Sequence, residues 1–408
     1  MLLSTRIYLD NNATTQPSVE VVDEMTRVMR ECWANPSSVH RAGGEAKREI
    51  ELARELVARL VGCQERELTF TSGGTEGVDL AIRGSLEHFA QTEPKRRVLV
   101  TTKFEHSAVR ELAQKLAKRG TEVVWLEGAA DHPGTPDLDA LEHLLKKRAP
   151  EIALVTLMWA NNEIGAITDI QRAGAMCRQH GVRIHTDATQ WVGKMPTSLA
   201  TTAVDLASFA AHKSHGPKGV GALYTRRGVH IVAQIYGGPQ EREHRGGTEN
   251  VAAIAGFGVA AELARIWLTT DGAIRGAAQR DRFERALASA TEGVIHDASD
   301  PHAARGAYGT RLWNTTNIGF TRLEAEAIVL LLSERGVCVS AGAACSSGSL
   351  DPSPVLLAMN IPPELAHGSI RFSLSKDTTD EECQRSVEII TQSIHRLRQS
   401  SASALPAS

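Results

Sequence analysis

Short runs of β-branched and other apolar residues alternate with helix-like stretches through the middle of the chain. Between about Val98 and Tyr224 the strand-like runs are VLVT, VVWL, IALVTL, VRIHTD, VDLASF and VGALY. Strands that alternate with helices in this way are typical of a mostly parallel sheet with helices on its faces. The pattern therefore predicts an α/β fold for this part of the chain.

Helical periodicity flanks the predicted sheet on both sides. Before it, one amphipathic helix is predicted from apolar residues at helical spacing: Ile50, Ala53, Leu56, Val57, Leu60 and Val61. After it, residues 251–268 are predicted to form a long helix that connects two domains, with the boundary near Glu262. An α+β region follows, and its last helix carries Val387, Ile390, Ile394 and Leu397 on one side. The polar tail 401–408 is predicted to be disordered.

Composition and charge are those of an ordinary soluble protein. The 408 residues are 42% hydrophobic and 23% charged, with a net charge of −3, which indicates neither a nucleic-acid nor a membrane partner. No apolar run approaches the ~20 residues that span a bilayer. The N-terminus MLLSTRIYLDNN lacks the pattern of a signal peptide, so we expect a cytoplasmic protein.

Six cysteines are scattered along the chain without a CxxC pair: Cys32, Cys63, Cys177, Cys338, Cys345 and Cys383. This spacing predicts neither a disulfide framework nor a zinc site, and most of them should be free thiols packed as small apolar groups. Cys345 differs because its segment, VCVSAGAACSSGSLDPSPVL, is too rich in Ser, Ala and Gly to pack as core. An exposed thiol there can act as a nucleophile once deprotonated, or the segment is a flexible loop with an incidental cysteine.

Three further segments contain residues that could bind a ligand or act in catalysis. Each of them also has a purely structural interpretation. In FTSGGTEGVDLAI the backbone N–H groups at a helix start could hold a phosphate, or Thr75 simply caps the helix after a Gly turn. Asp187 follows a strand-like run and lies where open α/β sheets bind ligands, or it caps the next helix. Lys213 follows an apolar run, where a lowered pKa would suit a Schiff base, or it is a surface lysine.

Together these three features favour pyridoxal phosphate as a cofactor. It needs a phosphate clamp, a carboxylate on its pyridine nitrogen and a lysine for its aldehyde. Lys213 comes 26 positions after Asp187. The interpretation as a P-loop nucleotide binder fails, because the GxxxxGK[ST] spacing is absent.

Ten segments, in order, resemble the motifs of the cysteine desulfurases and cover nearly the whole chain, from Tyr8 to about Ser375. They are YLDNNATT, ANPSSVHRAG, FTSGGTE, FEHSAV, WANNEIGAI, HTDATQWVGK, AAHKSHGPKGVGALY, GGPQEREHRGGTEN, SAGAACSSGS and HGSIRFSLS. The resemblance implies the aspartate-aminotransferase-like fold of pyridoxal-phosphate enzymes. It implies a large cofactor domain (13–261), a small domain built from both chain ends (1–12 and 262–400) and a homodimer.

The resemblance also implies a role for individual residues. Lys213 resembles the Schiff-base lysine, Asp187 the partner of the pyridine nitrogen, and His106 the ring that stacks on the cofactor and moves protons. The remaining positions follow the same motifs: Gln190 at the phenolic oxygen with Asn162 close by, Gly74, Thr75 and His212 at the phosphate, Thr248 at the phosphate of the neighbouring subunit, and Arg371 with the segment of Asn12 at the substrate carboxylate. Cys345 resembles the nucleophile that accepts sulfur. No resident metal is implied, and only Cys345 would touch a cluster in transit.

Two departures from the family pattern remove hydroxyl groups. Ala210 stands where the family usually has a serine on the phosphate, and the active loop reads SAGAAC rather than SSGSAC. We expect weaker retention of the cofactor with the activity kept.

The implied reaction takes sulfur from L-cysteine onto Cys345, releases alanine and passes the sulfur to an iron–sulfur scaffold or another acceptor protein. The segments NNATT, NPSS and AMNIPPELAHGSIRFSLS are most similar to the nitrogen-fixation branch, which supplies nitrogenase clusters; the housekeeping iron–sulfur branch differs little in these motifs. A selenocysteine lyase on the same fold is the nearest alternative. A non-catalytic scaffold that only binds a cluster would need several clustered thiolates, and the cysteines here are dispersed.

Overall fold

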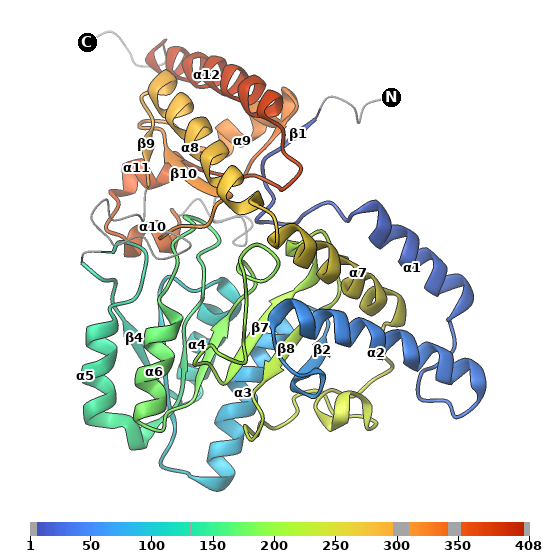
Figure 1. Ribbon diagram of the computed structural model, residues 1–408. Helices are drawn as coiled ribbons and strands as arrows, with labels where there is room; N and C mark the ends of the chain where they lie inside the picture. The colour runs from blue at the N-terminus through green and yellow to red at the C-terminus, as the bar shows by residue number, and fades with distance from the viewer. Residues whose placement is uncertain (1–5, 131, 297–309, 342–351, 404–408) are drawn as a thin grey trace.

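The computed structural model describes residues 6–130, 132–296, 310–341 and 352–403, with side chains described up to residue 400. A seven-stranded sheet forms its larger part (Figure 1), in the order β2-β8-β7-β6-β5-β3-β4. In that order the strands are β2 (Leu68–Thr71), β8 (Gly221–Thr225), β7 (Leu206–Ala210), β6 (Ile184–Asp187), β5 (Ile152–Thr156), β3 (Val98–Thr102) and β4 (Glu122–Leu126). Only β8 runs antiparallel to its neighbours in this sheet. The predicted α/β fold with a mostly parallel sheet is confirmed.

Helices cover both faces of the sheet. On one face α3 (Gly74–Thr92) and α4 (Ser107–Lys118) pack on alternate strand residues, among them Leu99, Leu154 and Leu206. The other face is covered by α2 (Arg41–Val61), α5 (Leu138–Arg148), α6 (Ile170–Gln179) and α7 (Val251–Leu268). Every residue of β5 is therefore buried, as expected for a parallel strand covered on both sides.

The predicted amphipathic helix before the sheet is α2, which packs along α7. The two helices approach so closely that a Cβ added to Gly258 would lie 2.7 Å from Cα of Ala53. By length and apolar composition α7 is the single helix in the described ranges that could cross a membrane. Half of it is buried inside the protein, which a core helix of a soluble protein also shows.

A second, smaller region contains two small sheets. Strands β12 (Ser369–Ser373), β10 (Thr315–Gly319) and β9 (Val294–Ile295) form one antiparallel sheet, in that order. The second pairs β1 (Ile7–Tyr8), near the N-terminus, with β11 (Val337–Cys338). Figure 1 shows α8 (Gly272–Thr291), α9 (Ala325–Glu334) and α12 (Asp380–Ser403) grouped above the large sheet. The remaining helices are α1 (Val19–Glu31), α10 (Pro354–Ala358) and α11 (Pro363–His367).

Residue 262, where the sequence places a domain boundary, falls inside α7, and the division at residues 13 and 262 stays a prediction. Helix α12 differs from expectation at its end, because it continues to Ser403 and so includes three residues of the tail that was predicted to be disordered. Earlier in the helix, the apolar residues Ile390 and Ile394 are buried and attach α12 to the core.

Candidate active site

One cavity of about 350 Å³ gathers most of the residues predicted from the sequence, at the carboxyl ends of the parallel strands. Ten of those residues line it: Asn12, Gly74, Thr75, His106, Asn162, Asp187, Gln190, His212, Lys213 and Arg371. Thr248 does not, because it is exposed between the short helix η4 (Gln240–Glu243) and α7. Cys345 lies outside the described residues.

The N-terminus of α3 forms one end of the cavity. Its N-cap is Gly73, without a side-chain cap, so the alternative in which Thr75 caps the helix is wrong. The first N–H groups of a helix have no partner within it, which makes this end a site for an anion. A Cβ on Gly74 would lie 2.8 Å from Oγ1 of Thr189, a buried hydroxyl without a hydrogen-bond partner in the described part of the chain. Only glycine leaves room there for a bound group.

Asp187 is the last residue of β6 and is 5% exposed. Its Oδ1 accepts the backbone N–H of Thr189 at 2.9 Å, which fixes the carboxylate within its own turn. No helix occurs in residues 188–205, all of which are described, so the helix-capping alternative is wrong. The carboxylate is therefore held facing the cavity.

Lys213 ends the short helix η3 (Ala211–Lys213), directly after β7. Its Nζ donates to the backbone oxygens of Asn12 and Ala13, at 2.7 and 2.8 Å. The alternative of a surface lysine is wrong, because the amine lies inside the cavity. Beside it, burial and the charge of Lys213 lower the pKa of His212 to about 4, so this imidazole is neutral at physiological pH.

His106 is the N-cap of α4. Its Nδ1 accepts the backbone N–H of Ala108 at 3.1 Å. A neutral imidazole carries one hydrogen, which must then lie on Nε2. The cap therefore fixes both the position of the ring and its tautomer.

Behind the cavity, Glu105 is a fully buried carboxyl group that the sequence did not single out. Its Oε1 accepts the backbone N–H of Met158, and burial together with the negative charge of Asp187 raises its pKa well above the usual range. Burial thus favours the protonated, neutral form of Glu105 behind the cavity. Burial also lowers the pKa of His185, between Thr156 and Ser208, to about 4.

Replacing Glu105 by glutamine should change how stability depends on pH. Because the folded pKa is raised, the folded chain keeps a proton that the unfolded chain loses above a pKa of about 4.3, so wild-type stability falls as pH rises. Above about pH 5, the free energy of unfolding of Glu105→Gln should therefore rise relative to that of wild type, by at most about 1.4 kcal/mol per pH unit. Urea unfolding at three pH values measures this. The exposed Glu111→Gln, on α4, is the control, and a Glu105→Gln curve parallel to wild type would contradict the assignment.

Arg371 and Asn12 form the opposite end of the cavity. Nη2 of Arg371 donates to Asp10 at 2.7 Å and Nη1 to the backbone oxygen of Asn162, while its buried Nε has no partner among the described residues. The Asn12 amide is already engaged: Nδ2 donates to Asn162 O and to Thr315 Oγ1, and Oδ1 accepts from other side chains. Arg371 thus keeps its Nε donor unsatisfied within the described ranges, whereas Asn12 links the two regions of the chain.

Three residues of the site were missed from the sequence: Glu105, Thr189 and Lys194. Glu105 and Thr189 lie directly beside a predicted residue, and Lys194 lies four positions after Gln190. The quoted motifs contain all three, so they mark these segments but not the contacts that the side chains make. The five described cysteines are free, and the described ranges contain no group of three or more His, Cys, Asp or Glu side chains placed to hold a metal ion.

Comparison with known proteins gives a consistent result over nearly the whole chain. The family model for class-V aminotransferases matches residues 7–385. A cysteine desulfurase from Trichormus azollae is 44% identical over 393 residues, which cover 96% of this chain and 94% of that protein. A solved NifS-like protein has a TM-score of 0.86 at 35% identity, covering 96% of this chain and all of the other. A NifS-like protein from Rickettsia africae has a TM-score of 0.81 at 29% identity, with 97% and 99% covered.

Proposed function

The chain belongs to the class-V aminotransferase family and, within it, to the cysteine desulfurases, and from this premise we propose that it is a pyridoxal-phosphate enzyme that takes sulfur from L-cysteine. The products are L-alanine and a persulfide on Cys345. One observation carries the proposal: Lys213, Asp187 and the free N-terminus of α3 face a single cavity.

The cavity fits this cofactor. The α3 N-terminus and the unpartnered Thr189 hydroxyl suit a phosphate, and Asp187 suits a protonated pyridine nitrogen. Its volume of about 350 Å³ accommodates a small ligand of this kind. When bound, the cofactor supplies an electron sink for the carbon atoms of the substrate.

The side chains around the cavity have separate tasks in this proposal. Lys213 would hold the aldehyde and move the proton of the substrate α-carbon, while His106 would lie against the ring with its Nε2 hydrogen available. Gln190 and Asn162 would hold the phenolic side, and Gly74, Thr75 and neutral His212 would hold the phosphate. The free donor of Arg371 binds the substrate carboxylate, for which a guanidinium is well shaped. The thiolate of Cys345 accepts the sulfur atom as the substrate Cβ–S bond breaks.

An assay with L-cysteine tests the reaction. Wild type should release alanine and, with a thiol reductant, sulfide in equal amounts. Cys345→Ala should form neither product at a measurable rate, whereas Cys338→Ala, which removes a partly exposed thiol of β11, should keep the activity. Full sulfide release by Cys345→Ala would contradict the persulfide step.

Retention of the cofactor should improve when the hydroxyl of the family is restored at Ala210. This residue lines the cavity beside Gly74, where a serine would add one hydrogen bond to the phosphate. A hydrogen bond to a charged group contributes roughly 1.5 kcal/mol or more, so the dissociation constant of pyridoxal phosphate should fall about tenfold. Ala108→Ser adds the same hydroxyl near His106 as a control. Equal dissociation constants for Ala210→Ser and wild type would contradict this role.

A homodimer completes the site in this proposal. Several large apolar side chains are exposed in residues 19–39 and in the segment that precedes η4. They are Val19, Val22, Met29, Trp33, Val39 and Tyr236. Gln240, in the segment that leads to Thr248, reaches Ser37 next to this surface. Exposed apolar patches of this kind mark interfaces, and Thr248 would then reach the phosphate of the partner chain. Delivery of sulfur to iron–sulfur clusters, including those of nitrogenase, and a cytoplasmic location stay predictions of the resemblance.

A further inference from the structure

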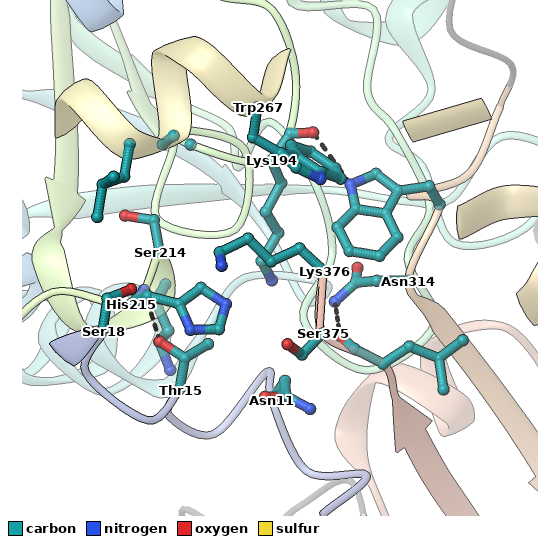
Figure 2. Close-up of a pocket in the computed structure, with 16 residues that line it drawn as sticks. Asn11, Thr15, Ser18, Lys194, Ser214, His215, Trp267, Asn314, Ser375 and Lys376 are labelled. Atoms are coloured by element: carbon teal, nitrogen blue, oxygen red, sulfur yellow. Dashed lines mark hydrogen bonds between the residues drawn. The ribbon is translucent and has the colours of Figure 1, made fainter. Parts of the chain in front are cut away.

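Lys194 is a buried lysine at the active site to which the reaction assigns no task. It lies in the turn that follows β6, four residues after Gln190, and is 5% exposed. Figure 2 shows it beside Trp267 and Lys376, in a second, mostly apolar hollow that adjoins the cavity. Lys194 and Lys213 both line this hollow. A buried amine opposes folding unless its donors are satisfied, so its contacts indicate what it does.

The Lys194 amine bonds to two side-chain amides. Its Nζ donates to Oε1 of Gln190 at 2.5 Å and to Oδ1 of Asn12 at 2.8 Å. Because the amine is the donor, each amide must turn its oxygen toward it and its nitrogen away. Lys194 thus fixes the orientation of both amides.

The orientation of Gln190 connects Lys194 to Lys213. Nε2 of Gln190 donates to the backbone oxygen of Asn12 at 2.9 Å, and the same oxygen accepts Nζ of Lys213 at 2.7 Å. An amide nitrogen has two hydrogens. The second hydrogen of Gln190 is therefore left for a ligand in the cavity, which Gln190 lines.

The charged groups around Lys194 are mostly cationic. Burial first, and then the charges of Lys213 and Arg371, lower its pKa well below the usual range. His215 and Lys376 also line the hollow, and the carboxylate of Asp377 lies beside both of them. Neutral or charged, the amine remains a donor, so its effect on the two amides holds over the working pH range.

We propose that Lys194 is a positioning residue that holds Gln190 with an N–H group toward the phenolic oxygen of the bound cofactor and keeps the Asn12 carbonyl on Lys213. This inference rests on the proposed function. A fixed donor at the phenolic oxygen stabilises the anionic form of that oxygen. Losing Lys194 should therefore raise the pH at which the absorption band of the bound cofactor changes.

The test is a pH titration of that band in the holoenzyme. Lys194→Met should raise the midpoint by about one pH unit, which corresponds to the loss of one hydrogen bond to a charged group. Lys376→Met removes a third lysine of the hollow, one that is bonded to Asp377 and not to Gln190, and should leave the midpoint unchanged. Within a Gln190→Leu background, Lys194→Met should cause little further shift, because Lys194 acts through Gln190.

The outcomes separate the inference from the function on which it rests. A wild-type protein without a cofactor band would overturn the proposed function. A band in every variant, with the same midpoint in wild type and Lys194→Met, would overturn the role of Lys194 alone. If Lys194→Met does not fold, Lys194→Gln replaces it in the comparison with Gln190→Leu and the double variant. Midpoint shifts that simply add in the double variant would contradict the proposal.

Discussion

Replacing Lys213 by alanine should lower the turnover of L-cysteine roughly a thousandfold or more. The variant loses both the amine that holds the cofactor and the group that moves the α-proton, and one positioned proton-transfer group alone contributes about 10²–10⁴-fold. The structure places this amine in the cavity, bonded to the Asn12 and Ala13 carbonyls. The rate of alanine formation measures the effect.

Lys218→Ala is the matched control for this prediction, since Lys218 is an exposed lysine five residues further along the same segment. It should keep the wild-type rate. Comparable rates for Lys213→Ala and Lys218→Ala would show that an amine other than that of Lys213 holds the cofactor and moves the α-proton.

Asp187→Asn should lower turnover by about 10²–10³-fold while leaving the protein folded. The asparagine oxygen can still accept the Thr189 N–H, so the turn is kept. The variant loses the negative charge that would face the ring nitrogen, and burial disfavours a charged carboxylate on Glu105 behind it. Removing one preorganised electrostatic contact of this kind typically reduces turnover by such a factor.

Asp205→Asn tests whether the loss is specific to the cavity. Asp205 also accepts a backbone N–H, that of Ile184, but it lies at the opposite end of β6 and β7. The Asp205→Asn variant should lose little activity. Equal losses in both variants would indicate a general effect of removing a buried carboxylate.

Local sequence pattern predicts most of the large sheet, because strands buried on both faces read as apolar runs and helices between them show a 3.6-residue period. It does not reveal that VGALY, which became β8, runs antiparallel, since direction depends on the connection and not on the strand. Strands β4 and β5 both appear as apolar runs in the sequence. The sequence therefore does not show that β4 is only partly buried at the edge of the sheet, whereas β5 is fully buried.

The sequence predicted those residues of the candidate site that lie within local motifs. Lys213, Asp187 and Gly74 each follow a strand, and parallel strands bring their carboxyl ends together. The bond from Lys194 to Asn12 joins residues 182 positions apart, and the raised pKa of Glu105 depends on what surrounds it in space. No local pattern carries such contacts, which is why these residues were missed.

The visible spectrum of the purified protein, before and after addition of L-cysteine, tests the central claim most directly. The account predicts an absorption band of bound pyridoxal phosphate that changes on adding L-cysteine in wild type and in Cys345→Ala, with turnover lost only in the variant. No band after incubation with pyridoxal phosphate, or a band that L-cysteine leaves unchanged, would contradict it.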